Sequence, residues 1–138
     1  MALNWEVDRE LLEQRRSHDA LKQQKNEPAL RYDAGKPRFD LLPSDALEEI
    51  AAVFAHGAEK YGDSNWLNGG MSWRRCLGSL LRHVFAWAAG RDLDDGPGGS
   101  GLPHMAHAAV NCIFLLTYAK RKLGTDDRLK EKPNAVKA

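Results

Sequence analysis

Three apolar segments with helical periodicity constrain the fold of this chain more than any other feature. In residues 45–61, 72–90 and 103–124 the apolar side chains recur every three or four positions, as on one face of an α-helix. No stretch alternates apolar and polar residues with the period of two that is typical of a β-strand. Ser44 and Ser72 stand where a side-chain oxygen can cap a helix. The pattern predicts an all-α fold, a compact bundle of three core helices.

The segments outside this bundle differ in composition. Residues 4–25 are rich in Glu, Gln, Arg and Lys with scattered apolar positions, which predicts a peripheral N-terminal helix. Residues 26–43 contain three prolines and predict an extended loop. We therefore expect a peripheral helical part over 1–30, a main domain over 31–124 and a basic tail over 125–138.

Composition excludes several classes of protein. The 138 residues suit one domain, and a net charge of +1 argues against a polybasic nucleic-acid binder, so no nucleic-acid partner is expected. No apolar run approaches the ~20 residues of a membrane span, and no membrane partner is expected. Cys76 and Cys112 lack the spacing of a disulfide framework or a zinc finger. We expect a soluble, cytoplasmic protein.

The near-zero net charge hides an uneven distribution. Residues 41–119 hold eight acidic and five basic side chains, whereas residues 120–138 hold seven basic and three acidic ones. Acidic side chains in an apolar bundle need a partner, because burial of an unpaired charge costs several kcal/mol. Metal coordination would supply that partner, and exposure to solvent would remove the need for one.

Carboxylates occur at two places that suit a cation. Asp92, Asp94 and Asp95 lie within four residues after the second predicted helix, and Mg²⁺ or Mn²⁺ prefers such oxygen ligands. Glu49 and Lys60 share one edge of the first predicted helix, where they would flank a cleft. An acidic turn and a solvated helix edge would show the same spacings.

Histidines mark the second and third predicted helices. His83 lies in the middle of an apolar helix, where a histidine is commonly a hydrogen-bonded core residue. His104, His107 and Asn111 form a polar stripe along one face of the third helix, close in sequence to Ser100. The HxxH spacing alone does not specify a zinc site, so the stripe indicates a functional surface without naming its ligand.

The loop over residues 31–40 interleaves cations with a glycine and an aromatic residue. Lys36 and Arg38 are the residue types that hold phosphate groups, although the loop is not a Walker A motif. A disordered linker is the alternative interpretation.

Four uncommon strings occur in order along the chain and carry a resemblance to a known family. They are RYDAGKPRFDLLP (31–43), GAEKYGDSNW (57–66), LLRHVFAW (80–87) and SGLPHMAHAAVN (100–111). The chain resembles the phage-type dATP/dGTP diphosphohydrolases, the MazZ-like branch of the MazG-like all-α nucleotide pyrophosphohydrolases. The resemblance covers roughly residues 31–119. It identifies 31–124 as an expected catalytic domain and implies a homo-oligomer, a dimer or tetramer, in the cytoplasm of a phage host.

The resemblance implies cleavage of dGTP or dATP between the α- and β-phosphates, giving the monophosphate and pyrophosphate. It implies two or more divalent ions, Mg²⁺, Mn²⁺ or Co²⁺, with Glu49 and the three aspartates Asp92, Asp94 and Asp95 as ligands. Ala52 and Arg91 stand where the superfamily's ExxE and ExxD pairs would have an acid, so the ligand set departs from that pattern. The compensating ligand would be Glu48, Asp92 or Asp95, and the stripe of His104 and His107 is an alternative.

The remaining candidate residues complete a hypothetical mechanism. Glu49 or His83 would take a proton from the attacking water. The cations expected to bind the phosphates are Lys36, Arg38, Lys60 and Arg82. Ser100 and His104 are expected to contribute polar groups to substrate binding, and Asn65 and Trp66 are expected to bind the purine.

Two other functions stay open at this point. A His-Asp-type metal phosphohydrolase would release phosphate or triphosphate, but the one adjacent His-Asp pair, His18-Asp19, lies in the peripheral helix. A non-enzymatic helical interaction module would bind a partner through tryptophans and the basic tail, and would show no metal-dependent turnover.

Overall fold

The computed structural model describes residues 10–18 and 28–131 of the chain. The chain divides into two units, Met1–Arg38 and Phe39–Ala138. Within the described residues the regular structure is helical and no strand occurs, apart from the isolated bridges Ser72–Thr125 and Leu93–Pro103. The predicted all-α class is therefore confirmed.

The first unit contributes a short helix and an irregular segment. Residues 10–18 are helical, with every side chain exposed, and residues 28–38 contain a turn in which the Lys36 N–H donates to the Asp33 carbonyl over 3.1 Å. The predicted peripheral helix over 4–25 is confirmed for residues 10–18, and its remainder lies outside the described residues.

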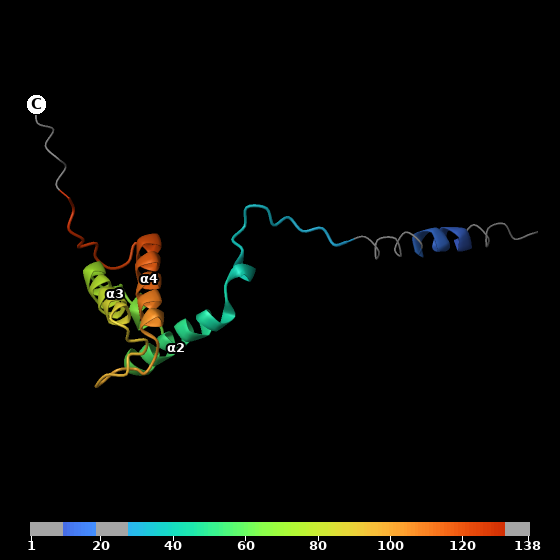
Figure 1. Cartoon of the computed structure of the whole chain (residues 1–138). Helices are drawn as coiled ribbons and strands as arrows, with labels where there is room; N and C mark the ends of the chain where they lie inside the picture. Colours follow the sequence, from blue (N-terminus) through green and yellow to red (C-terminus); the bar gives the residue numbers. More distant parts are fainter. Residues whose placement is uncertain (1–9, 19–27, 132–138) are drawn as a thin grey trace, which may run out of the picture. The chain divides into compact units, whose positions relative to one another are not determined.

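The second unit holds the three predicted core helices. Two short 3₁₀ turns and three α-helices follow one another in the order η1 (Phe39–Leu41), α2 (Ser44–Tyr61), η2 (Asn65–Leu67), α3 (Trp73–Ala88) and α4 (His104–Arg121). In Figure 1, α3 and α4 stand side by side and α2 crosses below them.

The ends of these helices follow from local chemistry, with one correction. The Ser72 hydroxyl oxygen accepts the Arg75 N–H over 3.4 Å, so the predicted cap of α3 is confirmed. The predicted Ser44 cap of α2 is wrong, because extended Pro43 occupies the capping position and Ser44 is already the first helical residue. At the other end, Gly62 adopts φ +88°, a conformation that favours glycine, and terminates α2.

Helix α4 packs against both other helices and supplies most of the buried side chains. Its Ala106 and Val110 pack against Val53 of α2 and form the centre of the core. Their small size lets the helices approach closely. Beside this centre Phe54 and Phe114 pack edge to face, with ring centroids 5.8 Å apart. This core therefore joins α2 to α4, and α4 also packs along α3.

The chain after α4 folds back onto the start of α3. The Trp73 indole N–H donates to the Leu123 carbonyl over 3.0 Å, and the Asp127 carboxylate accepts the Arg74 N–H over 3.0 Å. Gly124 has φ +70°, and a Cβ there would meet the Met71 carbonyl oxygen, so only glycine fits this crossing. These contacts fix the end of α4 relative to the beginning of α3.

No helix in residues 10–18 and 28–131 combines the length and the apolar character that crossing a membrane requires.

Candidate functional site

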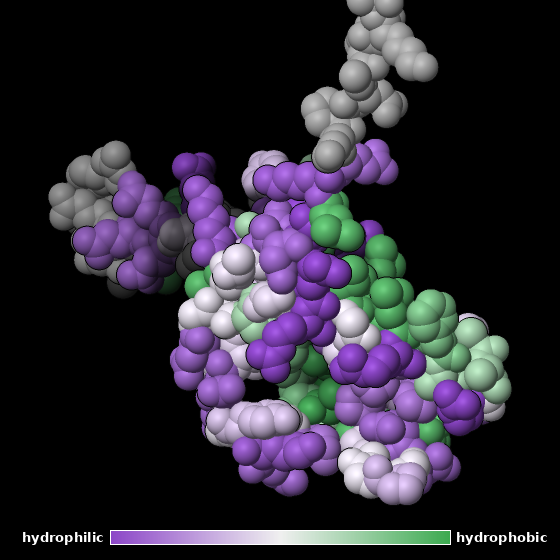
Figure 2. All heavy atoms as spheres, turned by 90° about the vertical axis from the view of Figure 1, so that its left-hand side faces the viewer, coloured by the Kyte–Doolittle hydropathy of each residue, from purple (hydrophilic) through white to green (hydrophobic). Residues whose placement is uncertain are grey.

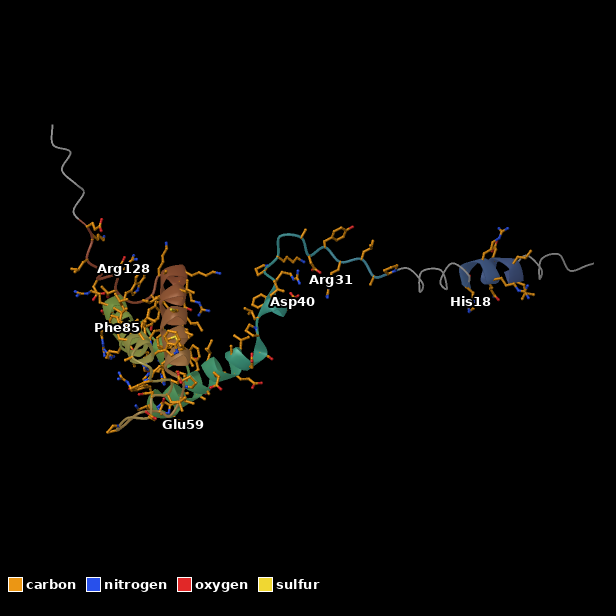
Figure 3. All side chains as sticks on the ribbon, viewed as in Figure 1. His18, Arg31, Asp40, Glu59, Phe85 and Arg128 are labelled. Atoms are coloured by element: carbon orange, nitrogen blue, oxygen red, sulfur yellow. The ribbon has the colours of Figure 1, made fainter. Side chains whose placement is uncertain are left out.

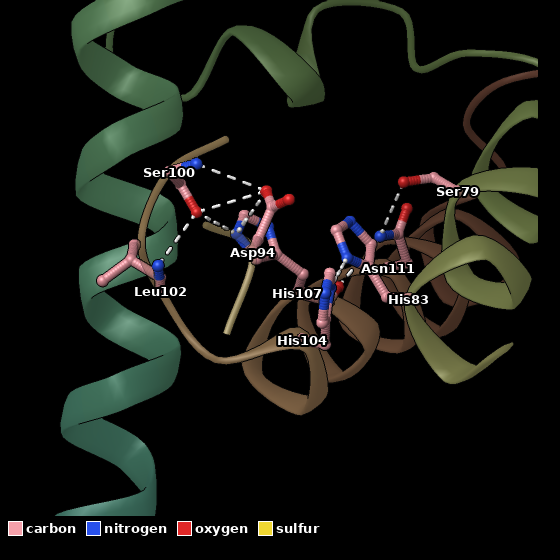
Figure 4. Close-up of polar contacts among 8 residues, drawn as sticks. All are labelled: Ser79, His83, Asp94, Ser100, Leu102, His104, His107 and Asn111. Atoms are coloured by element: carbon pink, nitrogen blue, oxygen red, sulfur yellow. Dashed lines mark hydrogen bonds and ion pairs between the residues drawn. The ribbon is translucent and has the colours of Figure 1, made fainter. Parts of the chain in front are cut away.

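Polar side chains gather where α3, α4 and the loop over residues 89–103 meet. Three histidines, an aspartate, a serine and an asparagine contact one another there, and Figure 4 shows their arrangement. We call this group the histidine–aspartate cluster, which consists of His83, Asp94, Ser100, His104, His107 and Asn111.

The register of α4 places three of these residues on one face. His104, His107 and Asn111 are spaced by three and four residues, so they stack along the helix on the side that meets α3. His104 and Asn111 are buried, with relative exposures of 7% and 8%. Buried polar side chains of this kind need hydrogen-bond partners, which the neighbouring elements supply.

The loop before α4 presents Asp94 and Ser100 through its own backbone hydrogen bonds. The Asp94 N–H donates to the Leu102 carbonyl over 2.9 Å, and the Gly101 N–H donates to the Asp94 carbonyl over 2.8 Å. A Cβ on Gly99 would meet the backbone carbonyl of Asp94, so the loop closes this tightly only with glycine at that position. The folded backbone of the loop therefore fixes the positions of the Asp94 and Ser100 side chains.

Ser100 connects the aspartate to one of the histidines. Its Oγ lies 2.6 Å from Nε2 of His107 and 3.4 Å from Oδ2 of Asp94, and it accepts the Leu102 N–H over 3.1 Å. Asp94 Oδ2 also accepts the Ser100 N–H over 3.3 Å and lies 3.8 Å from His107 Nε2. Both Ser100 and Asp94 approach the same ring nitrogen, which differs from a Ser-His-Asp triad, where they bind opposite nitrogens.

The other two histidines form a direct pair. Nδ1 of His83 lies 2.9 Å from Nδ1 of His104. One nitrogen must carry a proton and the other a lone pair, so the pair cannot be doubly protonated while this bond exists. The His83 ring also stacks on that of His107, with centroids 4.4 Å apart and an interplanar angle of 7°. His83 thus joins both histidines of α4.

Asn111 extends the cluster toward the middle of α3. Its amide nitrogen donates to the His107 carbonyl over 2.9 Å and to the Ser79 hydroxyl over 3.2 Å. Within the described residues no buried side-chain nitrogen or oxygen lacks a partner. The cluster is therefore a hydrogen-bonded network that ties α4 to α3.

Burial keeps two of the imidazoles neutral. It lowers the pKa of His83 below its ordinary value, and the neighbouring His107 and His104 lower it further, against the opposing effect of Asp94. Burial likewise lowers the pKa of His107, with Asp94 opposing and His56 and His104 adding to the effect. Although burial raises the pKa of Asp94, the Ser100 N–H and the histidines hold it below its usual range. A carboxylate beside neutral imidazoles is suited to accepting and passing on a proton.

The structure brings four of the sequence-predicted site residues into this cluster. They are His83, Asp94, Ser100 and His104. The sequence also pointed to His107 and Asn111 through their helical spacing, with His107 as an alternative metal ligand and no role for Asn111. It missed Ser79, whose position four residues before His83 on α3 was the available signal.

Six other predicted residues of the second unit have exposed side chains and are not part of the cluster. Those with exposed side chains on α2, η2, α3 or the loop are Glu49, Lys60, Asn65, Arg82, Asp92 and Asp95. The Lys60 ammonium lies 5.9 Å from the centroid of the Tyr61 ring. The Asp92 carbonyl accepts the His104 N–H over 2.8 Å, so its backbone supports the start of α4. The roles predicted for these side chains stay predictions.

Trp66 and the basic loop have different surroundings. The Trp66 ring stacks on Phe114, with centroids 4.6 Å apart and an interplanar angle of 20°, so that face is used by the core. Lys36 pairs with Asp33 over 3.6 Å, and both Lys36 and Arg38 belong to the first unit, whereas the cluster belongs to the second. Purine stacking by Trp66 and phosphate binding by the loop stay predictions.

The predicted metal ligands lie on α2 and on the loop over residues 89–103. Among residues 10–18 and 28–131, no group of three or more His, Cys, Asp or Glu side chains is arranged to hold a metal ion. Glu49, Asp92 and Asp95 are exposed, and Asp94 is engaged by Ser100. The described residues therefore do not form a ready ligand set for a divalent ion.

The fold and the cluster define a small all-α protein with a site suited to proton transfer. Comparison with known families assigns the chain to one family within this class of small all-α proteins. The family model described as dATP/dGTP diphosphohydrolase, N-terminal, matches residues 26–128. The chain belongs to this family, as the strings of its sequence suggested.

A curated relative and the solved structures complete the comparison. The chain is 35% identical over 99 residues to a protein of Salmonella phage PMBT28 named dATP/dGTP diphosphohydrolase. The match covers 72% of this chain and 32% of the relative, so the chain spans about a third of the relative's length. No solved structure matches the chain.

Proposed function

We propose that this chain hydrolyses dATP or dGTP between the α- and β-phosphates, releasing the deoxynucleoside monophosphate and pyrophosphate. Family membership and the name of the phage relative support the nucleotide substrate. The observation that carries the chemistry is the bond between His83 and His104, because it joins a neutral imidazole to a fixed partner at the edge of a carboxylate-containing cluster.

In this proposal His83 is the general base. When its Nδ1–H donates to Nδ1 of His104, the lone pair is on Nε2, and that nitrogen takes a proton from water. The water oxygen attacks the α-phosphorus as the bond from that phosphorus to the bridging oxygen breaks. Pyrophosphate leaves with the electron pair of the broken bond. The lowered pKa of His83 keeps the ring unprotonated near neutral pH.

The neighbours of His83 act as positioning residues. His104 is buried on α4 and sets the tautomer of His83 through the shared hydrogen bond. His107 stacks on His83 and is itself held by Ser100 and Asp94. Asp94 supplies negative charge near the histidines, which stabilises the imidazolium that forms when water loses its proton.

A requirement for Mg²⁺, Mn²⁺ or Co²⁺ is part of the proposal and rests on the resemblance. A divalent ion would supply charge neutralisation for the phosphates. Chelation by excess EDTA followed by addition of each ion separately tests it. We expect turnover to disappear with the chelator and to return with at least one ion, and unchanged turnover in EDTA would remove the requirement.

A second candidate function uses the same side chains. Histidines next to an aspartate also suit a His-Asp-type phosphohydrolase, which would release triphosphate or phosphate. The two functions differ in which bond is broken, so their products separate them.

The test is turnover of the 138-residue chain on a panel of canonical ribo- and deoxynucleoside triphosphates with each metal ion. Chromatography of the products is the measurement. We expect dGTP or dATP to yield its monophosphate and pyrophosphate in equal amounts. Triphosphate plus nucleoside would support the second candidate, and the absence of turnover on every substrate would support a non-enzymatic module.

A further inference from the structure

Helix α3 carries an apolar stripe that the described chain leaves uncovered. Leu77, Leu81 and Phe85 are spaced by four residues, so they lie along one face of the helix. Their relative exposures are 38%, 39% and 66%. Phe85 is labelled in Figure 3, and Figure 2 shows hydrophobic residues gathered between hydrophilic ones on the side of the unit where α3 lies. We call these three residues the α3 stripe.

The stripe is distinct from the face of α3 that builds the candidate site. Cys76, Ser79 and His83 belong to the opposite side of the helix, where they contact or face α4. The face with Cys76, Ser79 and His83 is covered by α4, whereas no described residue covers the α3 stripe. Contiguous exposed apolar residues of this kind mark interaction surfaces, because their removal from water is favourable.

The first half of α2 is uncovered in the same way. Residues 44–49 are all exposed, and Leu47 among them has a relative exposure of 42%. The contacts of α2 with α4 begin further along the helix, at Ile50, Val53 and Phe54. The chain therefore presents a second apolar position on a helix end that makes no core contact.

The two surfaces carry opposite charges. Helix α3 contains Arg74, Arg75 and Arg82 and no acidic residue. The first half of α2 contains Asp45, Glu48 and Glu49 and no basic residue. Helical spacing places Glu48 beside Leu47, and Asp45 and Glu49 on the other side of α2. The complementarity is therefore between a basic helix that carries an apolar stripe and an acidic half-helix that carries an apolar position.

We propose that a second copy of this chain covers the α3 stripe with the first half of its α2. A two-fold arrangement makes this contact twice, since each copy offers both surfaces. The resemblance implies only that copies of the chain associate. The charge and the exposure of the side chains assign the contact to α3 and the first half of α2. The proposal concerns association alone, so it is independent of the proposed activity.

The test is the association constant of the full chain, measured by sedimentation equilibrium. We expect Leu81→Glu on α3 and Leu47→Lys on α2 each to weaken association by at least about tenfold, because each places a charge in an apolar contact. The matched control is Leu116→Glu, which changes an exposed leucine of α4 outside both surfaces and is expected to associate like the unchanged chain.

Charge sign provides a second, internal control. Leu81→Lys faces the acidic half of α2 in the proposed contact, so its loss of association is expected to be smaller than that of Leu81→Glu. Circular dichroism and urea unfolding check that each variant is folded. Because these positions are exposed in the single chain, the substitutions are expected to leave the free energy of unfolding of an isolated copy nearly unchanged.

Cross-linking measures the contact without relying on a loss of association. The chain carrying Cys112→Ser, Leu47→Cys and Phe85→Cys is expected to form linked dimers with a short bismaleimide, whereas Cys112→Ser, Leu47→Cys and Leu116→Cys is not. A monomeric full chain, or equal effects of Leu81→Glu and Leu116→Glu, would overturn the proposal. Association that is lost with Leu81→Glu but kept with Leu47→Lys would overturn the assignment to α2.

Discussion

At the scale of single residues, the hydrogen bond between His83 and His104 sets what each ring can do. A proton shared between the two Nδ1 atoms fixes one ring as donor and the other as acceptor. In the tautomer that we propose, His104 does no chemistry itself and decides which nitrogen of His83 carries the lone pair. The two residues should therefore respond differently to substitution.

We expect His83→Gln to lower kcat by about 10²- to 10⁴-fold with little change in KM, because a glutamine amide cannot accept the proton. His104→Gln retains a hydrogen-bonding side chain and is expected to lower kcat less and to shift the pH profile of kcat. Steady-state kinetics from about pH 5 to pH 9 measure both. Full activity of folded His83→Gln would show that another group takes the proton.

Sequence reasoning singled out all six residues of the cluster and not the way they combine. The spacing of His104 and His107 predicted a shared face, because helical geometry alone determines it. The bond to His83 depends on how α3 packs against α4, and no local pattern encodes that packing. The exposed positions of Asp92 and Asp95 depend on the path of the loop, which its glycines leave undetermined in the sequence.

At the scale of elements, the loop over residues 89–103 determines whether the cluster assembles. Its backbone hydrogen bonds present Asp94 and Ser100 to His107, and glycine at position 99 permits the close approach to the Asp94 carbonyl. The first and last residues of the three α-helices were predictable to within a few positions, since caps and glycines mark them. The course of this loop was not predictable.

We expect Gly99→Ala to disrupt the loop and to lower activity more than Gly96→Ala does. A Cβ at position 99 meets the backbone carbonyls of Asp94 and Gly96, whereas a Cβ at position 96 has open space. Turnover and the free energy of unfolding of both variants check this, with a loss of about 1–3 kcal/mol expected for Gly99→Ala and less than about 1 for Gly96→Ala. Equal behaviour of the two would contradict the role given to the loop.

The contact between α3 and α4 should weaken in acid. The folded-state pKa values of His83 and His107 are lowered, so the unfolded chain binds more protons as the pH falls below about 6.5. The contribution of these two histidines to the free energy of unfolding is fully present above that pH and is lost as the pH falls through their folded-state pKa values. The titratable or charged groups that influence these two rings are Asp94, His56, His104 and Arg82.

Urea unfolding at about pH 7.5 and pH 5.5 measures this dependence. We expect a lower free energy of unfolding at the more acid pH, and a smaller difference in the chain carrying His83→Asn and His107→Gln. The aspartates with lowered pKa values, Asp94, Asp126 and Asp127, titrate at more acid pH than this window. An equal difference in the variant and the unchanged chain would contradict the assignment to these histidines.

At the scale of the whole molecule, a near-balanced net charge combines local regions of opposite sign. The first half of α2 is acidic and α3 is basic, while the histidine–aspartate cluster places a carboxylate beside neutral rings. Sequence counts gave the balance, but the regions became visible only once exposure was known. The chain spans about a third of the phage relative, so the activity that we propose for it is tested on this chain itself.

The most direct test of the central claim is hydrolysis of dGTP and dATP by the 138-residue chain in ¹⁸O-labelled water. Mass spectrometry of the products locates the oxygen that came from water. Attack at the α-phosphorus predicts one ¹⁸O atom in the deoxynucleoside monophosphate and none in pyrophosphate. Label in pyrophosphate, release of triphosphate, or no hydrolysis of either nucleotide would contradict it.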